Sequence, residues 1–146
     1  MDVIIKTFDE LSAQELFEIY KLRVSVFVVE QQCPYQDIDD LDKAAYHVRL
    51  TDENGILAYL RVLPTGTQFE TAGIGRVIAA ERRKGYGSAV LKEGIKVAKE
   101  KLNADIITVE AQTYARGLYE KAGFKQVSEE FFEDGIPHIR MELHLN

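Results

Sequence analysis

The chain has little of what stabilises secreted proteins or carries a protein across a membrane. It contains one cysteine, so no disulfide can form within the chain. No apolar run is long enough to cross a bilayer. The first ten residues, MDVIIKTFDE, lack the basic and then apolar pattern of a signal peptide. We therefore expect a cytoplasmic protein that does not act at membranes.

Several kinds of site also lack their usual signals. The formal net charge of −6 argues against a large surface for nucleic-acid phosphates. The three histidines, His47, His138 and His144, lack the spacing of metal ligands, so we expect no metal site. Cys33 has no activating cation or base near it in the sequence, which argues against a covalent acyl-enzyme. His138, within GIPHIRM, is instead a candidate substrate contact.

What the chain does contain is typical of a globular domain. It has 146 residues, of which 46% are hydrophobic and 29% charged, without repeats or linkers. The residue pattern predicts the element order β, α, α, β, β, β, α, β, α, β, β. We expect one mixed α/β domain over residues 1–146.

Local signals support this assignment. Ser12 and Glu15 form a capping-box pattern at the start of the first helix. The apolar stretch 24–30 follows without a turn signal, so we predict a second short helix there. The sequence DENG predicts a hairpin turn with Gly55 at positive φ. Two final strands are expected, at 124–132 and from residue 138 on.

The most informative stretch is RRKGYGSAV, residues 82–90. Two glycines, one residue apart, follow three cations, and a helical pattern begins directly after them. Backbone N–H groups of such a turn, a helix N-terminus and nearby cations together attract phosphate. A P-loop and a dinucleotide fingerprint are excluded, since G-x-x-x-x-G-K-[ST] is absent and Val90 stands where a third glycine would be. Taken alone, the stretch fits either a pyrophosphate site or a plain turn.

Several segments together resemble one family. The R-x-x-G-x-G pattern at 82–87 resembles the coenzyme A signature of the GNAT N-acetyltransferases, and LYEKAGF at 118–124 is similar to the family's helix-to-strand segment. The segments 23–42 and 133–141 resemble its ElaA branch. The resemblance implies a central, mixed, mostly antiparallel sheet that is splayed and flanked by helices.

The resemblance also implies acetyl-CoA as co-substrate and a place for it. The sheet would splay between Val77 and Thr108 to admit the pantetheine arm, and an N–H near Ile78 would polarise the thioester carbonyl. The expected cofactor-binding residues are Val77, Ile78, Ala79, Arg82, Arg83, Lys84, Gly85, Tyr86, Gly87 and Ser88.

Two residues are candidates for proton transfer. Tyr119 stands where the family often places the general acid that protonates the departing thiolate; the alternative is a tyrosine that fills core beside Phe124. Glu110, on a polar strand face, is the first candidate for the base that deprotonates the amine, and Glu30 is the second. Either glutamate also fits a plain polar residue.

Four aspartates crowd one predicted loop: Asp37, Asp39, Asp40 and Asp42. They fit either a solvated loop or a pocket rim that attracts a cationic amine. Their spacing is not that of an EF-hand.

The expected activity is acetyl transfer from acetyl-CoA to a primary amine of a small molecule or peptide, by direct attack in a ternary complex. The alternative is a non-catalytic acyl-CoA-binding sensor or partner module. Members of this fold often pair, so the resemblance leaves a homodimer open.

Overall fold

The computed structural model describes residues 1–81 and 83–145. The strands are β1 (Asp2–Thr7), β2 (Tyr46–Asp52), β3 (Gly55–Leu63), β4 (Ala72–Ala79), β5 (Ile106–Gln112), β6 (Lys125–Gln126), β7 (Phe131–Glu133) and β8 (Ile136–His144). The helices are α1 (Ala13–Arg23), α2 (Tyr86–Leu102) and α3 (Arg116–Lys121), with the shorter η1 (Phe8–Glu10), η2 (Val24–Glu30), η3 (Asp40–Lys43) and η4 (Thr113–Ala115).

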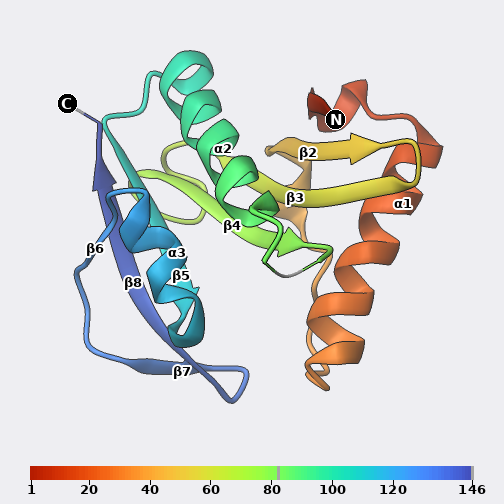
Figure 1. Ribbon diagram of the computed structural model, residues 1–146. Coiled ribbons are helices and arrows are strands. Elements are labelled where there is room, and N and C mark those ends of the chain that lie inside the picture. The colour runs from red at the N-terminus through yellow and green to blue at the C-terminus, as the bar shows by residue number, and fades with distance from the viewer. Residues whose placement is uncertain (82, 146) are drawn as a thin grey trace.

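The eight strands of the described residues belong to one sheet (Figure 1), in the order β1-β2-β3-β4-β5-β8-β6 with β7 also paired to β8. The β4–β5 pair is parallel, and the other pairs among the described strands are antiparallel. The expectation of a mixed, mostly antiparallel sheet is confirmed. Among the described residues, no helix is both long and apolar enough to span a bilayer.

Strand β3 separates two hydrophobic cores, because its side chains alternate between the faces of the sheet. Leu60 and Val62 belong to the larger core, which includes the apolar side of α2. Tyr59 belongs to the smaller core, with Ile19 of α1. Helix α2 therefore covers one face of the sheet and α1 the other.

The predicted hairpin and capping box are confirmed. Gly55 has φ 128° at the turn between β2 and β3. The Glu15 N–H donates to Ser12 Oγ at 3.1 Å, and the Ser12 N–H donates to Glu15 Oε1 at 2.9 Å. The stretch 24–30 is helical as predicted. It is not a separate helix, however, because it continues α1 without a break as a π-helix.

The strand predicted at 124–132 is divided into β6 and β7. Both lie along β8. After the backbone hydrogen bond from the Val127 N–H to the Arg140 carbonyl, side-chain hydrogen bonds replace the ladder. Gln126 Nε2 donates to the Ser128 carbonyl, and the Arg140 N–H donates to Ser128 Oγ. The backbone therefore leaves the sheet at this point and returns at Phe131.

Strands β4 and β5 diverge after two paired positions, Ala72 with Ile107 and Gly73 with Thr108 (Figure 1). Beyond Gly73, the edge of β4 that faces β5 has no strand partner in the described part of the chain. The Thr71 and Thr108 hydroxyls are hydrogen-bonded at the point of divergence. The expected splay of the sheet is confirmed.

Candidate functional site

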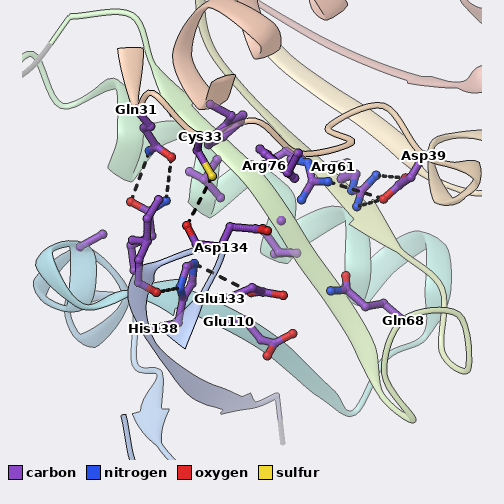
Figure 2. A pocket seen from close by; sticks show the side chains of 18 of the residues that line it. Gln31, Cys33, Asp39, Arg61, Gln68, Arg76, Glu110, Glu133, Asp134 and His138 are labelled. Atoms are coloured by element: carbon purple, nitrogen blue, oxygen red, sulfur yellow. Dashed lines mark hydrogen bonds and ion pairs between the residues drawn. The ribbon is translucent and has the colours of Figure 1, made fainter. Parts of the chain in front are cut away.

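A cavity of about 290 Å³ lies where β4 and β5 separate (Figure 2). Its walls come from β3, β4, β5, α3, the segment after η2 and the β7–β8 hairpin. Four residues that the sequence singled out separately line it together: Val77, Glu110, Tyr119 and His138. Glu30 does not line it and is exposed at the end of η2.

Strand β4 carries a bulge beside this cavity. Leu60 of β3 lies opposite two residues of β4, Arg76 and Val77. Arg76 has φ 54°, in the left-handed region that non-glycine residues rarely adopt. A Cβ added at the neighbouring Gly75 would meet nothing within 4 Å. Packing within the protein therefore does not require glycine at this position, and its backbone stays open to a ligand in the cavity.

The glycine turn precedes α2, at the end of β4. Gly85 is the N-cap with φ 77°, and no side chain of the described residues caps the helix there. Arg83 also has a positive φ, 63°. A Cβ at Gly87 would make only ordinary contacts, the nearest at 3.7 Å to Leu118. The backbone N–H groups in the first turn of α2 are therefore uncapped, and the glycines leave space above them. An anionic group such as a pyrophosphate could bind there.

The other expected cofactor residues have different environments. Ile78 is buried in the smaller core, Val77 is half-buried at the cavity and Ala79 is exposed. Lys84 and Ser88 are exposed, whereas Tyr86 packs against the larger core. Arg82 lies outside the described residues.

Tyr119 fills core and also lines the cavity. Its side chain packs edge-to-face on Phe124, with ring centroids 5.7 Å apart, and only 7% of the residue is exposed. Burial raises the pKa of Tyr119, so the phenol keeps its proton at neutral pH. Its hydroxyl has no hydrogen-bond partner among the described residues. The two interpretations of this residue are therefore compatible.

Glu110 lies on β5 with its carboxylate at the cavity. Burial and then the charge of Glu133 raise the pKa of Glu110 above its ordinary value. Arg140 opposes this shift from 3.9 Å. A carboxylate with a raised pKa is a stronger base, which suits proton removal from an ammonium group.

The aspartate loop is not solvated as a whole. Asp37 accepts a hydrogen bond from Arg23 Nε at 3.0 Å and pairs with Arg76 Nε at 2.8 Å. Asp42 accepts from Arg23 Nη1 at 2.6 Å. Asp39 pairs with Arg61 at 2.6 Å and lines the cavity. Of the four aspartates, Asp40 alone is fully exposed.

The neighbouring arginines lower the pKa values of Asp39 and Asp42. Burial would raise the pKa of Asp42, but the hydrogen bonds and charges of Arg23 and Arg61 outweigh it and hold the pKa below its ordinary value. The pKa of Asp39 is also lowered, because Arg61 outweighs the effect of burial. The loop is thereby fixed as one wall of the cavity.

Sequence reasoning missed the partners of these aspartates. Arg61 and Arg76 stand in the largely apolar stretches ILAYLRVLP and TAGIGRVIAA. A charge within a strand of this kind needs a buried counter-charge, and that signal points to the aspartate loop. His47 adds a neutral contact, since its Nε2 donates to the Asp42 carbonyl at 2.9 Å and burial lowers its pKa.

His138 has one defined tautomer. Its Nδ1 lies 2.7 Å from the Ile136 carbonyl, and a carbonyl only accepts, so Nδ1 carries the proton. The Nε2 lone pair is then left toward the cavity, 3.9 Å from Glu133. The ring stacks on Phe131.

Two contacts join the segment after η2 to β5 and to the β7–β8 hairpin. The side-chain amides of Gln31 and Gln112 form a reciprocal pair of hydrogen bonds at 3.3 and 3.4 Å. Cys33 Sγ donates to the Asp134 carbonyl at 3.5 Å. Within the described residues, no group of three or more His, Cys, Asp or Glu side chains is placed to hold a metal ion.

Known proteins share both the sequence pattern and this architecture. Residues 9–145 match the family described as "Acetyltransferase (GNAT) domain". The UPF0039 protein of Schizosaccharomyces pombe is 38% identical over 99% of this chain and 98% of its own length. Protein ElaA of Escherichia coli is 37% identical over 90% of this chain and 89% of its own length. The crystal structure of an acyl-CoA N-acyltransferase from Pseudomonas aeruginosa is similar with a TM-score of 0.89 and 34% identity, over 97% of this chain and 99% of that one.

Proposed function

The chain belongs to the GNAT acetyltransferase family, in its ElaA-like branch, and on that premise we propose that it transfers an acetyl group from acetyl-CoA to a primary amine. The acceptor would be a small molecule or a peptide, and the reaction would take place in the cytoplasm. The observation that carries the proposal is the cavity between β4 and β5, which has the uncapped start of α2 at the end of β4 and Glu110, Tyr119 and His138 on its walls.

The residues at the end of β4 and the start of α2 would hold the coenzyme. Backbone N–H groups from Arg83 to Gly87 would bind its pyrophosphate, with Arg83 and Lys84 adding positive charge. The free edge of β4, from Val77 to Ala79, would bind the pantetheine arm as an added strand would. A backbone N–H near Ile78 would then polarise the thioester carbonyl.

The proposed reaction needs two proton movements. Glu110 takes one proton from the incoming ammonium group, which leaves a neutral amine. The amine nitrogen attacks the thioester carbonyl carbon directly and forms the amide C–N bond while the C–S bond breaks. The second proton of the nitrogen passes to Tyr119 and replaces the one that the phenol gives to the thiolate. Tyr119 protonates or hydrogen-bonds the departing thiolate. The enzyme contributes mainly by holding both substrates in position.

Release of the coenzyme A thiol in the presence of different amines tests this proposal. The protein is incubated with acetyl-CoA and a panel of amines, and free thiol is followed over time. Thiol release that depends on an amine supports an acetyltransferase. Coenzyme A that raises the Tm, with no release for any amine, would favour a binding module instead. If coenzyme A does not raise the Tm and no amine causes thiol release, both the acetyltransferase and the binding module are excluded.

A further inference from the structure

The charges on the cavity wall are unbalanced. Among the described residues, four carboxylates and two guanidinium groups line it: Asp39, Glu110, Glu133, Asp134, Arg61 and Arg76. Figure 2 shows Arg61, Arg76 and Asp39 on one side, with Glu110, Glu133 and His138 together on the other. The side with Glu110 and Glu133 is therefore the one where a bound cation would balance the charge.

The arginine side is already neutralised. Arg61 pairs with Asp39 at 2.6 Å and with Asp42 at 3.0 Å. Arg76 pairs with Asp37 at 2.8 Å and with Asp39 at 3.5 Å. Aspartates therefore balance the charge of both guanidinium groups, which leaves little net attraction there for a carboxylate of the acceptor. An acceptor that carries a carboxylate beside its amine is disfavoured.

The opposite side carries three acidic groups, Glu110, Glu133 and Asp134. Arg140 lies 3.9 Å from Glu110, but it also lies over the Phe69 ring and is 47% exposed. Glu133 is half-exposed at the cavity, and Asp134 follows it in the hairpin turn. This side thus holds three carboxylates against one partly solvated cation.

His138 adds an independent observation. It is 8% exposed, and its Nε2 has no hydrogen-bond partner in the described part of the chain, since the 3.9 Å approach to Glu133 is too long. In the neutral ring, with the proton on Nδ1, Nε2 accepts a hydrogen bond. An acceptor nitrogen at the cavity wall, near Glu133, fits a ligand rich in N–H donors, and a primary ammonium group has three.

We propose, on the basis of the proposed function, that the acceptor is a primary amine with a second cationic group a few bonds away. The amine to be acetylated lies between Glu110 and His138 Nε2. The second cation lies toward the outside, against Glu133 and Asp134, and stays protonated throughout the reaction. Free aliphatic diamines and lysine side chains beside another basic residue share this chemistry.

The test compares butylamine with 1,4-diaminobutane, which differ by one terminal ammonium group. Thiol release from acetyl-CoA is measured for both, and the ratio of kcat/KM is taken. The expected ratio favours the diamine by about tenfold or more, as for one charge-assisted hydrogen bond. In Glu133→Gln the ratio falls toward one. In the matched control Glu130→Gln, an exposed glutamate outside the cavity, the ratio stays at the wild-type value.

Equal kcat/KM for the two amines in the wild type, or a ratio that Glu133→Gln leaves intact, overturns the inference while acetyl transfer stands. No thiol release with any amine overturns the proposed function and the inference with it. An unchanged coenzyme A thermal shift in Glu133→Gln shows that this variant is folded. Peptides with lysine beside arginine or citrulline distinguish the two sources: an arginine preference larger than the diamine preference assigns a basic peptide, and a smaller one assigns a free diamine.

Discussion

At the scale of single residues, Tyr119 packs and also presents a hydroxyl to the cavity, so the two roles can be separated. Tyr119→Phe keeps the ring against Phe124 and removes only the oxygen. We expect kcat to fall by roughly 10²-fold, as for loss of a general acid, with little change in the KM for acetyl-CoA. Steady-state kinetics measure both. Tyr46→Phe, on β2 and away from the cavity, is the control. Wild-type turnover in Tyr119→Phe would end the acid role.

Arg23 is a second single residue on which the site depends, through the aspartate loop. Its side chain is fully buried between Asp37 and Asp42. Arg23→Leu leaves two buried carboxylates without this partner, so we expect the free energy of unfolding to fall by about 3–5 kcal/mol. Lys43→Ala, which removes an exposed pair with Asp40, should cost less than about 1 kcal/mol. Urea denaturation of the two variants measures the difference, and similar losses would contradict the account.

At the scale of elements, the turn before α2 is expected to determine affinity for the coenzyme. Arg83→Glu places a negative charge beside the uncapped helix start, so we expect the KM for acetyl-CoA to rise by about tenfold or more, the effect of 1.4 kcal/mol of lost binding. Lys99→Glu makes the same charge change near the other end of α2. The KM of this control should stay near the wild-type value. An unchanged KM in Arg83→Glu would remove the turn from the pyrophosphate site.

Elements with a local signal could be predicted from the sequence. The period of apolar residues predicts α2, and DENG predicts the hairpin at Gly55, because both depend on residues close in the chain. The division of the strand at 124–132 depends on Ser128 bonding to Arg140, twelve residues away. Helix α1 continues into η2 without a break, and no residue near Val24 indicates whether one helix continues there or a second one begins. Local patterns do not contain such information.

At the scale of the whole molecule, the site needs the fold to bring distant segments together. The family resemblance predicts Tyr119, and the polar face of its strand predicts Glu110. The arginine partners of the aspartates, by contrast, lie 14 to 39 residues from those aspartates in the sequence. No local pattern relates Arg76 to Asp37. The sheet order, which places β5 beside β4 and opens the cavity between them, also came from the resemblance and not from periodicity.

The buried ionic network makes the stability of the whole chain depend on pH. The pKa values of His47, Asp39 and Asp42 are lowered in the folded state, and the Ser12 N–H and Arg49 lower that of Glu15 to about 2. The unfolded chain therefore binds protons more readily at these groups. We expect the free energy of unfolding to fall as the pH drops below about 6.5, and further between about 4.5 and 2.

Urea denaturation at pH 7, 5.5 and 3.5 measures this dependence. In Glu15→Gln, the part of the loss that lies between about pH 4.5 and 2 should be smaller, because that carboxylate no longer titrates. A chain that is as stable at pH 3.5 as at pH 7 would contradict the network.

The central claim is that the cavity between β4 and β5 joins an acetyl group to an amine. The most direct measurement is the mass of the product: the protein, acetyl-CoA and 1,4-diaminobutane are incubated, and free coenzyme A and N-acetylated amine are quantified together. The account predicts equal amounts of both, and little of either without protein or with Tyr119→Phe. Coenzyme A released without any acetylated amine, or an acetylated protein in its place, would contradict direct transfer.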